Sequence, residues 1–208
     1  MASARIEAIG LSKSFSGVTL FTDVSFTLGP GVLAVTGPNG SGKTTLLKIL
    51  ASLLRPTSGS VRLEADGRAL SGDESRTSIG WSGPDLSFYP GLTAAENLSF
   101  FRRAAGFVAS REDVLVRLET VGLEGVGEPV EHFSTGMKQR LRIAFADLLD
   151  PPILILDEPM SGLDSGGRAA VQRVVSSARR RGPVVLASTD VEELPEADQV
   201  LELPRREK

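Results

Sequence analysis

The segment GPNGSGKTT, from Gly37 to Thr45, limits the possible folds of this chain more than any other stretch. It matches the pattern G-x-x-x-x-G-K-[ST], whose glycines let successive main-chain N–H groups converge on phosphate oxygens. The continuous apolar run Val32–Val35 precedes it and predicts a strand buried on both faces. An apolar helical stripe follows it, formed by Leu46, Leu47, Ile49, Leu50, Leu53 and Leu54. Strand, loop and helix in this order predict a phosphate-binding loop, with the positive end of the helix facing the phosphates.

The residue types of this loop suit a nucleoside triphosphate with Mg²⁺. We expect the phosphates to be held by Gly37 and by the main chain of Asn39, Gly40, Ser41, Gly42, Lys43, Thr44 and Thr45. Lys43 is expected to reach the β- and γ-phosphates, and the Thr44 hydroxyl to bind Mg²⁺. The alternative is a glycine-rich turn with a chance lysine, which would not require a strand before the loop and a helix after it.

The rest of the sequence predicts an α/β core. Ile153–Leu156 and Val184–Ala187 are further continuous apolar runs, and a helical pattern covers about 168–181. Another helical pattern covers about 92–121, with an apolar face of Leu98, Phe100, Phe101, Val114, Leu115 and Leu118. Apolar strands that alternate with helices are typical of a parallel sheet. Near the N-terminus, apolar and polar residues alternate in the segments 5–9, 24–28 and 61–64, which predicts antiparallel strands with one wet face.

An acidic pair, Asp157 and Glu158, follows directly after an apolar run in the segment ILILDEP. The carboxyl end of a buried strand is where α/β sheets bind ligands. We expect Asp157 to hold the metal through water, and Glu158 to orient and polarise the attacking water. Two surface carboxylates at a strand end are the alternative, and the phosphate-binding loop upstream makes this the weaker interpretation.

A third motif, FSTGMKQRL, spans 133–141 and ends where another helical stripe begins. Ser134 suits the N-cap of that helix. Taken alone, the stretch predicts only a capped helix with a glycine nearby. Its position before the acidic strand favours a functional interpretation.

Composition excludes several other classes of protein. The 208 residues carry a net charge of −3 and have a pI of about 5.4, which does not favour a nucleic-acid-binding surface. The chain has no cysteine, so disulfides and thiolate sites are excluded, and the single His132 cannot form a multi-histidine metal site. No apolar run approaches the roughly 18 residues of a membrane span, and the start MASARIEAIG lacks the apolar core of a signal peptide. We therefore expect a soluble, intracellular protein.

The motifs GPNGSGKTT, FSTGMKQRL, ILILDEP and SGLD (Ser161–Asp164), in this order, resemble those of the ATP-binding cassette (ABC) ATPases of the P-loop NTPase superfamily. The resemblance covers nearly the whole chain, and the ordered combination is far more specific than any one motif. It implies a single cassette over 1–208, with a P-loop core built on a mostly parallel sheet. It also implies an N-terminal antiparallel β subdomain, with elements within about 1–30 and 58–70, and a helical subdomain insert at about 86–145.

The resemblance implies an ATPase that binds ATP and Mg²⁺. Lys43 and Glu158 would be the catalytic residues, and Thr44 and Asp157 would hold the metal. In this family two cassettes enclose two ATP molecules head to tail, and ATP binding closes the dimer.

The resemblance also assigns residues to contacts that the spacing alone does not suggest. Ser134 and Gly136 would contact the γ-phosphate held by the second cassette chain, and the SGLD segment would cross the interface. Phe15 would stack on adenine, as aromatic rings do with nucleic-acid bases. A phenylalanine packed in a hairpin is the alternative for Phe15.

Two residues that this family usually has are missing. Pro84 stands where a glutamine is usual. Thr189 aligns best with the histidine that follows the last core strand, and a one-residue shift would put Asp190 there, so no histidine is available in either alignment. Asp85, beside Pro84, is expected to be a solvated loop acid, and the alternative is that it substitutes for the glutamine. Because a charge-assisted hydrogen bond contributes about 1.5–3 kcal/mol, loss of the histidine predicts ATP turnover slowed by roughly 10- to 150-fold. ATP binding is expected to survive.

The sequence is therefore interpreted as the ATP-hydrolysing subunit of an ABC transporter. The expected partners are a transmembrane permease, docked on the helical insert, and a second cassette chain, identical or different. This interpretation places the chain in the cytoplasm, on the inner face of the cell membrane, and involves no nucleic acid. Two alternatives are a slow, nucleotide-gated partner in a heterodimeric transporter and a soluble ABC ATPase without a transport role. FSTGMKQRL is complete enough to serve a partner's site, although Thr135 and Met137 replace the usual glycine and glutamine.

Overall fold

A five-stranded parallel sheet forms the centre of the computed structural model, which describes residues 4–71, 73–108, 110–190 and 194–205. The strand order is β6-β7-β8-β3-β9. These strands are β3 (Gly31–Thr36), β6 (Ile79–Ser82), β7 (Ile153–Asp157), β8 (Pro183–Ser188) and β9 (Gln199–Glu202). Every residue of β3, β7 and β8 is buried, as their continuous apolar runs predict. The expected α/β fold with a parallel sheet is confirmed.

A second, antiparallel sheet has the strand order β2-β1-β4-β5. Its strands are β1 (Arg5–Phe15), β2 (Val18–Leu28), β4 (Ser58–Ala65) and β5 (Arg68–Ala69). In β1 the predicted alternation is present, because Ile6 and Ala8 are buried and Arg5 is exposed. The pairing register shifts between Ala8 and Leu11, where Gly10 takes a φ of 59°. Such a bulge bends a strand and increases its local twist.

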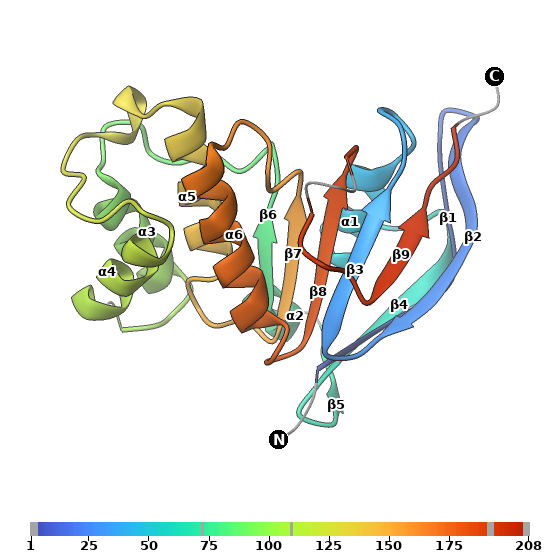
Figure 1. Ribbon diagram of the computed structural model, residues 1–208. Coiled ribbons are helices and arrows are strands. Elements are labelled where there is room, and N and C mark those ends of the chain that lie inside the picture. The colour runs from blue at the N-terminus through green and yellow to red at the C-terminus, as the bar shows by residue number, and fades with distance from the viewer. Residues whose placement is uncertain (1–3, 72, 109, 191–193, 206–208) are drawn as a thin grey trace.

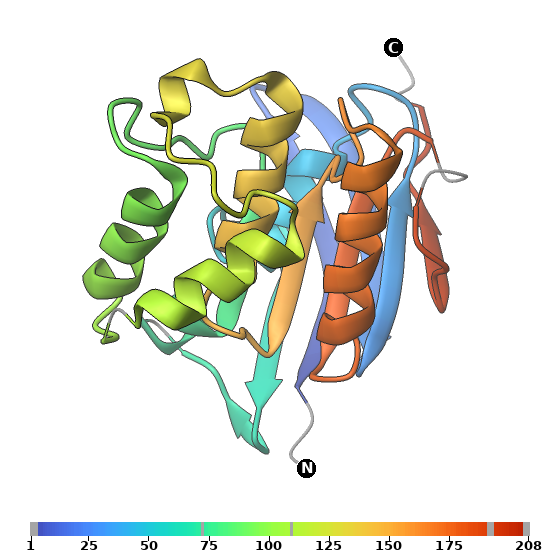
Figure 2. The same ribbon diagram turned by 60° about the vertical axis from the view of Figure 1, so that its left-hand side comes forward.

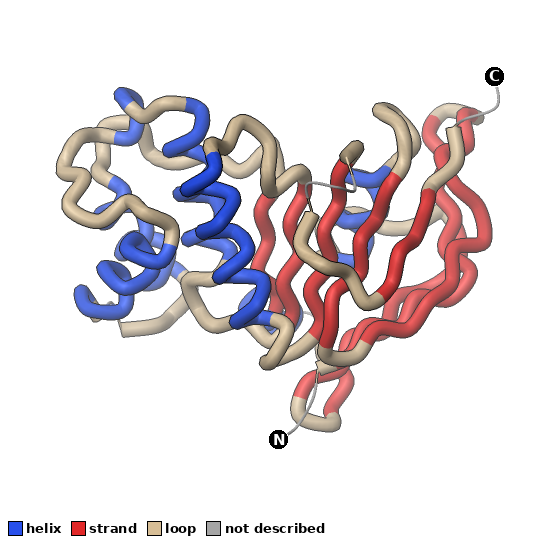
Figure 3. The backbone as a smooth tube through the Cα atoms, in the orientation of Figure 1, coloured by secondary structure: helices blue, strands red, loops and turns tan. Residues whose placement is uncertain are grey.

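Helices cover both faces of the parallel sheet. Helix α1 (Lys43–Leu50) lies between the two sheets, whereas α5 (Thr135–Ala146) and α6 (Ser165–Ala178) lie on the opposite face of the parallel sheet (Figure 1). Helices α3 (Ala94–Ala104) and α4 (Arg111–Thr120) lie farther out, beside α5 (Figure 2). Most helices therefore gather at one side of the molecule and the strands at the other (Figure 3). The remaining helical elements are short, namely α2 (Asp73–Ser78) and the 3₁₀ turn η1 (Val130–His132).

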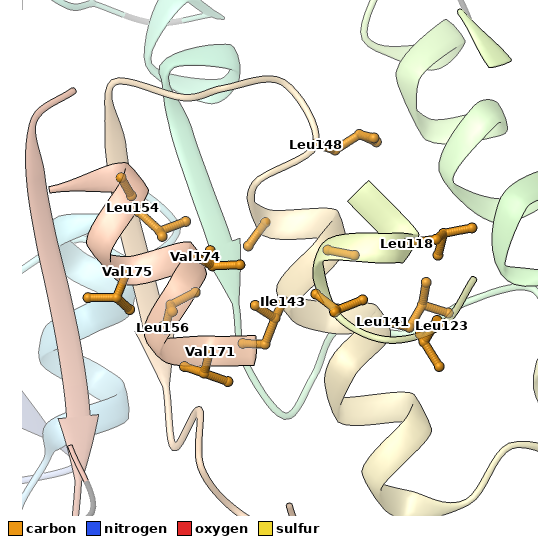
Figure 4. Close-up of a cluster of buried hydrophobic side chains, with 14 of the residues drawn as sticks. Leu118, Leu123, Leu141, Ile143, Leu148, Leu154, Leu156, Val171, Val174 and Val175 are labelled. Carbon is orange, nitrogen blue, oxygen red and sulfur yellow. The ribbon is translucent and has the colours of Figure 1, made fainter. Parts of the chain in front are cut away.

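Two apolar clusters, one on each face of the parallel sheet, form the core. Because side chains alternate along a strand, Ile153 and Ile155 join the cluster with α1, and Leu154 and Leu156 join the cluster with α5 and α6. Figure 4 shows the second cluster, in which the strand leucines meet Ile143, Val171, Val174 and Val175. Full burial of each such side chain contributes about 1.5–3 kcal/mol. The clusters fix the sheet, and thus the ends of its strands, between two layers.

The stretch 92–121, expected to be one helical pattern, forms two helices. Gly106 lies between α3 and α4 with a φ of 86°. Ser110 caps α4 by accepting a hydrogen bond from the Asp113 amide at 3.3 Å. The apolar periodicity continues across this break because each helix has its own buried stripe, which includes Leu98 in α3 and both Val114 and Leu118 in α4.

The predicted apolar face of this stretch is correct in part. Leu98, Val114 and Leu118 are buried, but Phe100 and Leu115 are 40% and 45% exposed. Phe100 and Leu115 follow the buried Leu98 and Val114 by two positions and one position, so they lie on another side of their helices than the buried stripe.

Several boundaries also differ from the expectation. Helix α1 ends at Leu50, and Leu53 is exposed. Helix α6 begins at Ser165 rather than near Arg168, because Asp164 caps it by accepting a hydrogen bond from the Gly167 amide at 2.8 Å.

No helix among the described residues combines the length and the apolar character that a membrane span requires.

Candidate functional site

The predicted phosphate-binding loop connects the carboxyl end of β3 to α1. Gly37 has a φ of 139°, and a Cβ built on it would lie 2.3 Å from the Leu203 carbonyl oxygen. Only glycine fits at such a close approach. Gly42 precedes α1 with a φ of 105° and caps the helix without a side chain. The first-turn amides, which include those of Thr44 and Thr45, are therefore available to phosphate oxygens.

The rest of the loop is open at its tip and buried at its base. Asn39 and Gly40 are exposed, and Gly40 has a φ of 80°. Ser41 is buried, and its hydroxyl has no hydrogen-bond partner among the residues that the structure describes. The exposed tip thus leaves the main chain of the loop accessible to a ligand, although the Ser41 amide donates to the Pro38 carbonyl oxygen at 3.1 Å.

Lys43 is the first residue of α1, and its ammonium group is bonded to the start of the loop. It is 7% exposed, and its Nζ donates hydrogen bonds to the carbonyl oxygens of Gly37 at 2.7 Å and Pro38 at 3.3 Å. The same Nζ lies 3.9 Å from Oε1 of Glu158. A fixed, partly desolvated ammonium group thus lies between the loop and the acidic strand end.

Thr44 and Asp157, the residues expected to hold Mg²⁺, are in direct contact. The Thr44 hydroxyl donates a 2.6 Å hydrogen bond to Asp157 Oδ2, and Asp157 Oδ1 is buried without a partner in the described part of the chain. Burial raises the pKa of Asp157, against the opposing effects of the Thr44 hydrogen bond and the Lys43 charge. A buried carboxylate oxygen without a partner is unfavourable, and a bound cation or its water would relieve it.

The donor set agrees with Mg²⁺ and not with an all-protein metal cage. Among the described residues, no three His, Cys, Asp or Glu side chains gather in a group that could hold a metal. Mg²⁺ usually keeps several waters and binds one or two carboxylates together with substrate phosphates. Thr44 and Asp157 fit that pattern beside a phosphate-binding loop.

Glu158 has an unusual backbone conformation. Its φ is 48°, in the left-handed region, which is unfavourable for residues other than glycine by about 1–2 kcal/mol. Its amide donates a 2.9 Å hydrogen bond to the carbonyl of Ala187 in β8, and the Ser188 hydroxyl donates to Oε2 at 3.4 Å. Burial raises the pKa of Glu158, and the Lys43 charge opposes this. Strain of this kind is concentrated at functional sites.

Ser134 and Gly136 lie apart from these residues, at the start of α5. Ser134 is the N-cap, as predicted, and its hydroxyl accepts a hydrogen bond from the Met137 amide at 3.2 Å. Arg140 of α5 donates to Asp164 at 2.5 Å, which places the SGLD segment beside the same helix end. The surface hollow lined by these residues contains no part of the phosphate-binding loop. The hollow at the start of α5 is therefore separate from the phosphate-binding loop within one chain.

Phe15 ends β1 and is paired with Val18 of β2. It is 47% exposed, and Lys13 Nζ lies 4.6 Å from its ring centroid. The ring is therefore not enclosed in the hairpin. Its contact with adenine stays a prediction.

Pro84 and Thr189, which stand where the family usually has a glutamine and a histidine, lie at the surface. Pro84 is exposed after β6, and Thr189 is exposed just beyond β8, where its main chain hydrogen-bonds Glu158. Asp85, expected to be a solvated loop acid, is 52% exposed but pairs with Lys48 of α1 at 3.1 Å. His132 is exposed in η1.

Three side chains near the site were not predicted as part of it. Ser188 contacts Glu158, and Lys48 contacts Asp85. Gln139 of α5 donates to the carbonyl oxygen of Glu158 at 3.2 Å. Gln139 lies in FSTGMKQRL, but its partner is separated from it by an entire loop and strand. Only the packing of α5 against β7 reveals this contact.

Comparison with known proteins gives a consistent result. A model of the ABC transporter family matches residues 21–161. The chain is 36% identical over 189 residues to the cytochrome c biogenesis ATP-binding export protein CcmA of Brucella abortus (strain 2308), covering 90% of this chain and 86% of that protein. It is 37% identical over 183 residues to the lantibiotic transport ATP-binding protein SrtF of Streptococcus pyogenes, covering 87% and 78%.

A solved structure agrees in the arrangement of the whole chain. The dimeric structure of MJ0796, a bacterial ABC transporter cassette, has a TM-score of 0.84 with this structure and is 25% identical, covering 96% of this chain and 94% of that one. The fold of this chain is thus that of a cassette. With the family match over most of its length, the chain belongs to the ABC transporter family, as an ATPase subunit of the P-loop NTPase superfamily.

Proposed function

We propose that this chain binds and hydrolyses ATP and couples the closure of a cassette dimer to a transmembrane permease. The observation that carries the proposal is the meeting of the phosphate-binding loop with two carboxylates. Lys43 Nζ lies 3.9 Å from Glu158 Oε1, and the Thr44 hydroxyl donates to Asp157 at 2.6 Å. A cation, a hydroxyl and two acids thus converge where the loop amides are available.

Each residue has one task in the proposed reaction. The amides from Asn39 to Thr45 and the Lys43 ammonium group bind the phosphates and neutralise their charge. Thr44 and Asp157 hold Mg²⁺, which neutralises charge that develops on the phosphate oxygens. Glu158 orients and polarises the attacking water, with its backbone fixed by β8.

A second cassette chain completes the site. The hollow at Ser134 and Gly136 offers a capped helix start, whose partial positive charge suits a γ-phosphate presented by another chain. ATP would then bridge two chains, and hydrolysis would remove the bridging phosphate and release them. The change is a population shift set by the difference in affinity before and after hydrolysis.

The proposed permease contact lies on the helical insert. Tyr89 and Phe100 are 48% and 40% exposed, and their ring centroids are 4.9 Å apart in an edge-to-face pair. Phe101 joins this pair to Phe145 of α5, 5.0 Å away. An exposed aromatic pair backed by the core suits contact with a protein partner. In this proposal the chain lies on the inner face of the membrane, held there by its partner, and no nucleic acid is involved.

The relatives favour export as the direction of transport. The name of CcmA describes an ATP-binding export protein, and that of SrtF a lantibiotic transport protein.

We further propose that 1–208 acts as one cassette, with antiparallel elements within 1–30 and 58–70 and a helical subdomain at 86–145.

Calorimetry on the purified chain tests nucleotide binding. MgATP should bind to the wild type, and Lys43→Ala should abolish the heat of binding. Arg103→Ala, on the exposed surface of α3, is the matched loss of a cation and should leave binding unchanged. No heat with the wild-type chain would overturn the proposal.

Affinity purification from detergent-solubilised membranes tests the transport role. An integral membrane protein should be recovered with the chain. Recovery of the chain without any such partner would contradict the transport role and support a soluble ABC ATPase.

A slow site in a heterodimeric transporter is the second candidate. The observation that favours it is the surface at Pro84 and Thr189, which offers neither the glutamine nor the histidine side chain. Hydrolysis by the isolated chain should be slow while MgATP binding persists. Turnover of tens per second by the chain alone, or recovery of only the homodimer from native cells, would contradict it.

A further inference from the structure

Gln139 is a buried polar residue of α5 with no task in the reaction above. It is 7% exposed, and its Nε2 donates hydrogen bonds to the main-chain oxygens of Glu158 and Pro159 at 3.2 and 3.3 Å. On the other side, the Glu158 amide donates to Ala187 of β8 at 2.9 Å. The left-handed backbone of Glu158 is therefore held between β8 and α5.

Arg142 sets the orientation of the Gln139 amide. Side chains three positions apart on a helix are neighbours, and Arg142 Nη1 donates to Gln139 Oε1 at 3.2 Å. Because Oε1 accepts this bond, Nε2 is the atom that faces the two carbonyls. Both residues are thus needed to present the donors to the Glu158 loop.

The same guanidinium group reaches the segment that joins β6 to α3. Arg142 Nε donates to the main-chain oxygen of Leu86 at 3.3 Å. The preceding residue, Asp85, pairs with Lys48 of α1 at 3.1 Å. The segment at 85–86 is thus tied to the helix after the phosphate-binding loop and, through α5, to Glu158.

We propose that Gln139 and Arg142 are positioning residues for Glu158. Arg142 and Gln139 form a series of hydrogen bonds that runs from the Leu86 carbonyl to the Glu158 carbonyl. This series sets where the Glu158 carboxylate lies. A displacement of the segment at Leu86 therefore changes the rate of hydrolysis and leaves nucleotide affinity unchanged. The inference rests on the proposed role of Glu158 in orienting water.

The hydrogen bonds of these two side chains explain why rate and affinity separate. In the described part of the chain, they go to α5, to Leu86 and to the loop after β7. None goes to the phosphate-binding loop. Their removal therefore leaves the phosphate contacts in place and frees the Glu158 peptide.

Single-turnover hydrolysis of MgATP by the purified full chain tests the proposal, since it measures slow rates. Gln139→Leu and Arg142→Met should each lower the rate by about tenfold, which corresponds to about 1.4 kcal/mol. Because the two act in series, the double variant should be no slower than the slower single variant. Arg142→Lys, which keeps a donor, should recover part of the rate.

Two further measurements separate positioning from a merely structural role. The calorimetric affinity for MgATP should stay unchanged in both single variants. The midpoint of thermal unfolding should fall by only about 2–4 °C for each kcal/mol that the lost buried hydrogen bonds contributed, so both variants stay folded in the assay. Arg103→Met is the matched control, because the Arg103 guanidinium also donates to a main-chain oxygen, that of Ser99 at 3.3 Å. It should hydrolyse at the wild-type rate.

A wild-type rate in Gln139→Leu, additive losses in the double variant, or a rate loss matched by lost MgATP affinity would each overturn the proposal. If Gln139→Leu does not fold, Gln139→Glu keeps the contact with Arg142, lacks the amide donor and should show the same slow rate. Glu158→Gln in the same assay separates the two claims. A normal rate in Glu158→Gln would refute the role of Glu158 itself. A normal rate in Gln139→Leu together with a slow rate in Glu158→Gln would refute only the positioning role of Gln139 and Arg142.

Discussion

The hydroxyl of Thr44 donates a 2.6 Å hydrogen bond to one oxygen of the Asp157 carboxylate, and the other oxygen is buried without a partner among the described residues. The first helical turn after the phosphate-binding loop is thus connected directly to the acidic end of β7.

Asp157→Asn should remove most of the gain in ATP affinity that Mg²⁺ provides. A hydrogen bond to a charged group contributes about 1.5–3 kcal/mol, so affinity in the presence of Mg²⁺ should fall by roughly 10- to 150-fold. Calorimetry with and without Mg²⁺ measures it. Asp66→Asn changes an exposed aspartate in a turn and serves as the control. Equal Mg²⁺ dependence in both variants would exclude Asp157 as a ligand.

Glu158→Gln should lower the rate of hydrolysis by at least about 100-fold, because a positioned general base contributes 10²- to 10⁴-fold. MgATP affinity should be retained, since the amide keeps the size of the side chain. Single-turnover kinetics with calorimetry separates the two effects. Glu119→Gln, at an exposed position of α4, should behave as the wild type. A normal rate in Glu158→Gln would assign the water to another residue.

Gly37→Ala should destabilise the chain and weaken nucleotide binding. The new Cβ would lie 2.3 Å from the Leu203 carbonyl oxygen, at a φ that alanine rarely adopts. Overpacking of this kind typically lowers the free energy of unfolding by about 1–3 kcal/mol. Urea denaturation measures the change, and Gly127→Ala, whose Cβ would meet no neighbour within 4 Å, is the control. Equal stability of the two variants would contradict the close approach of Gly37 to the Leu203 carbonyl.

The cap of α3 predicts a pH-dependent stability. The Glu96 carboxylate accepts hydrogen bonds from the amide and the hydroxyl of Thr93, both at 2.8 Å, and the main-chain bond contributes most to lowering the pKa of Glu96. A lowered pKa in the folded chain means that this stabilisation is present above the unfolded pKa of about 4.3. It is lost as the pH falls through the lowered value.

Glu96→Ala should therefore destabilise the chain at neutral pH, and its difference from the wild type should shrink in acid. Urea denaturation at several pH values measures that difference. Glu124→Ala, at an exposed loop position, should show no such trend. A difference that grew as the pH fell would contradict the capping role of the ionised carboxylate.

The strands and the motifs that flank them were predictable because both signals are local. The buried run Val32–Val35 and the loop after it identify β3 and α1, and the run before Asp157 identifies β7. Strands β6 and β9 gave no such signal. The first has four residues with a glycine in it, and the second is an edge strand that leaves most of its side chains exposed.

Side-chain pairs across the fold were less accessible to sequence reasoning. The contact of Gln139 with Glu158, like that of Lys48 with Asp85, joins elements that only tertiary packing brings together. The break at Gly106 was also missed. The apolar spacing of 92–121 stays helical on both sides, and a glycine inside a helical pattern is tolerated often enough to be ambiguous.

Glu158 shares its positive φ with residues such as Ser16 and Ser52, which lie in exposed turns. Glycine adopts this backbone conformation without steric cost. At exposed turns such as those of Ser16 and Ser52, glycine would remove only a short side chain, whereas at Glu158 it would remove the carboxylate that lies 3.9 Å from Lys43 Nζ. At Glu158 the relief of backbone strain and the retention of an acid beside the phosphate-binding loop are therefore mutually exclusive.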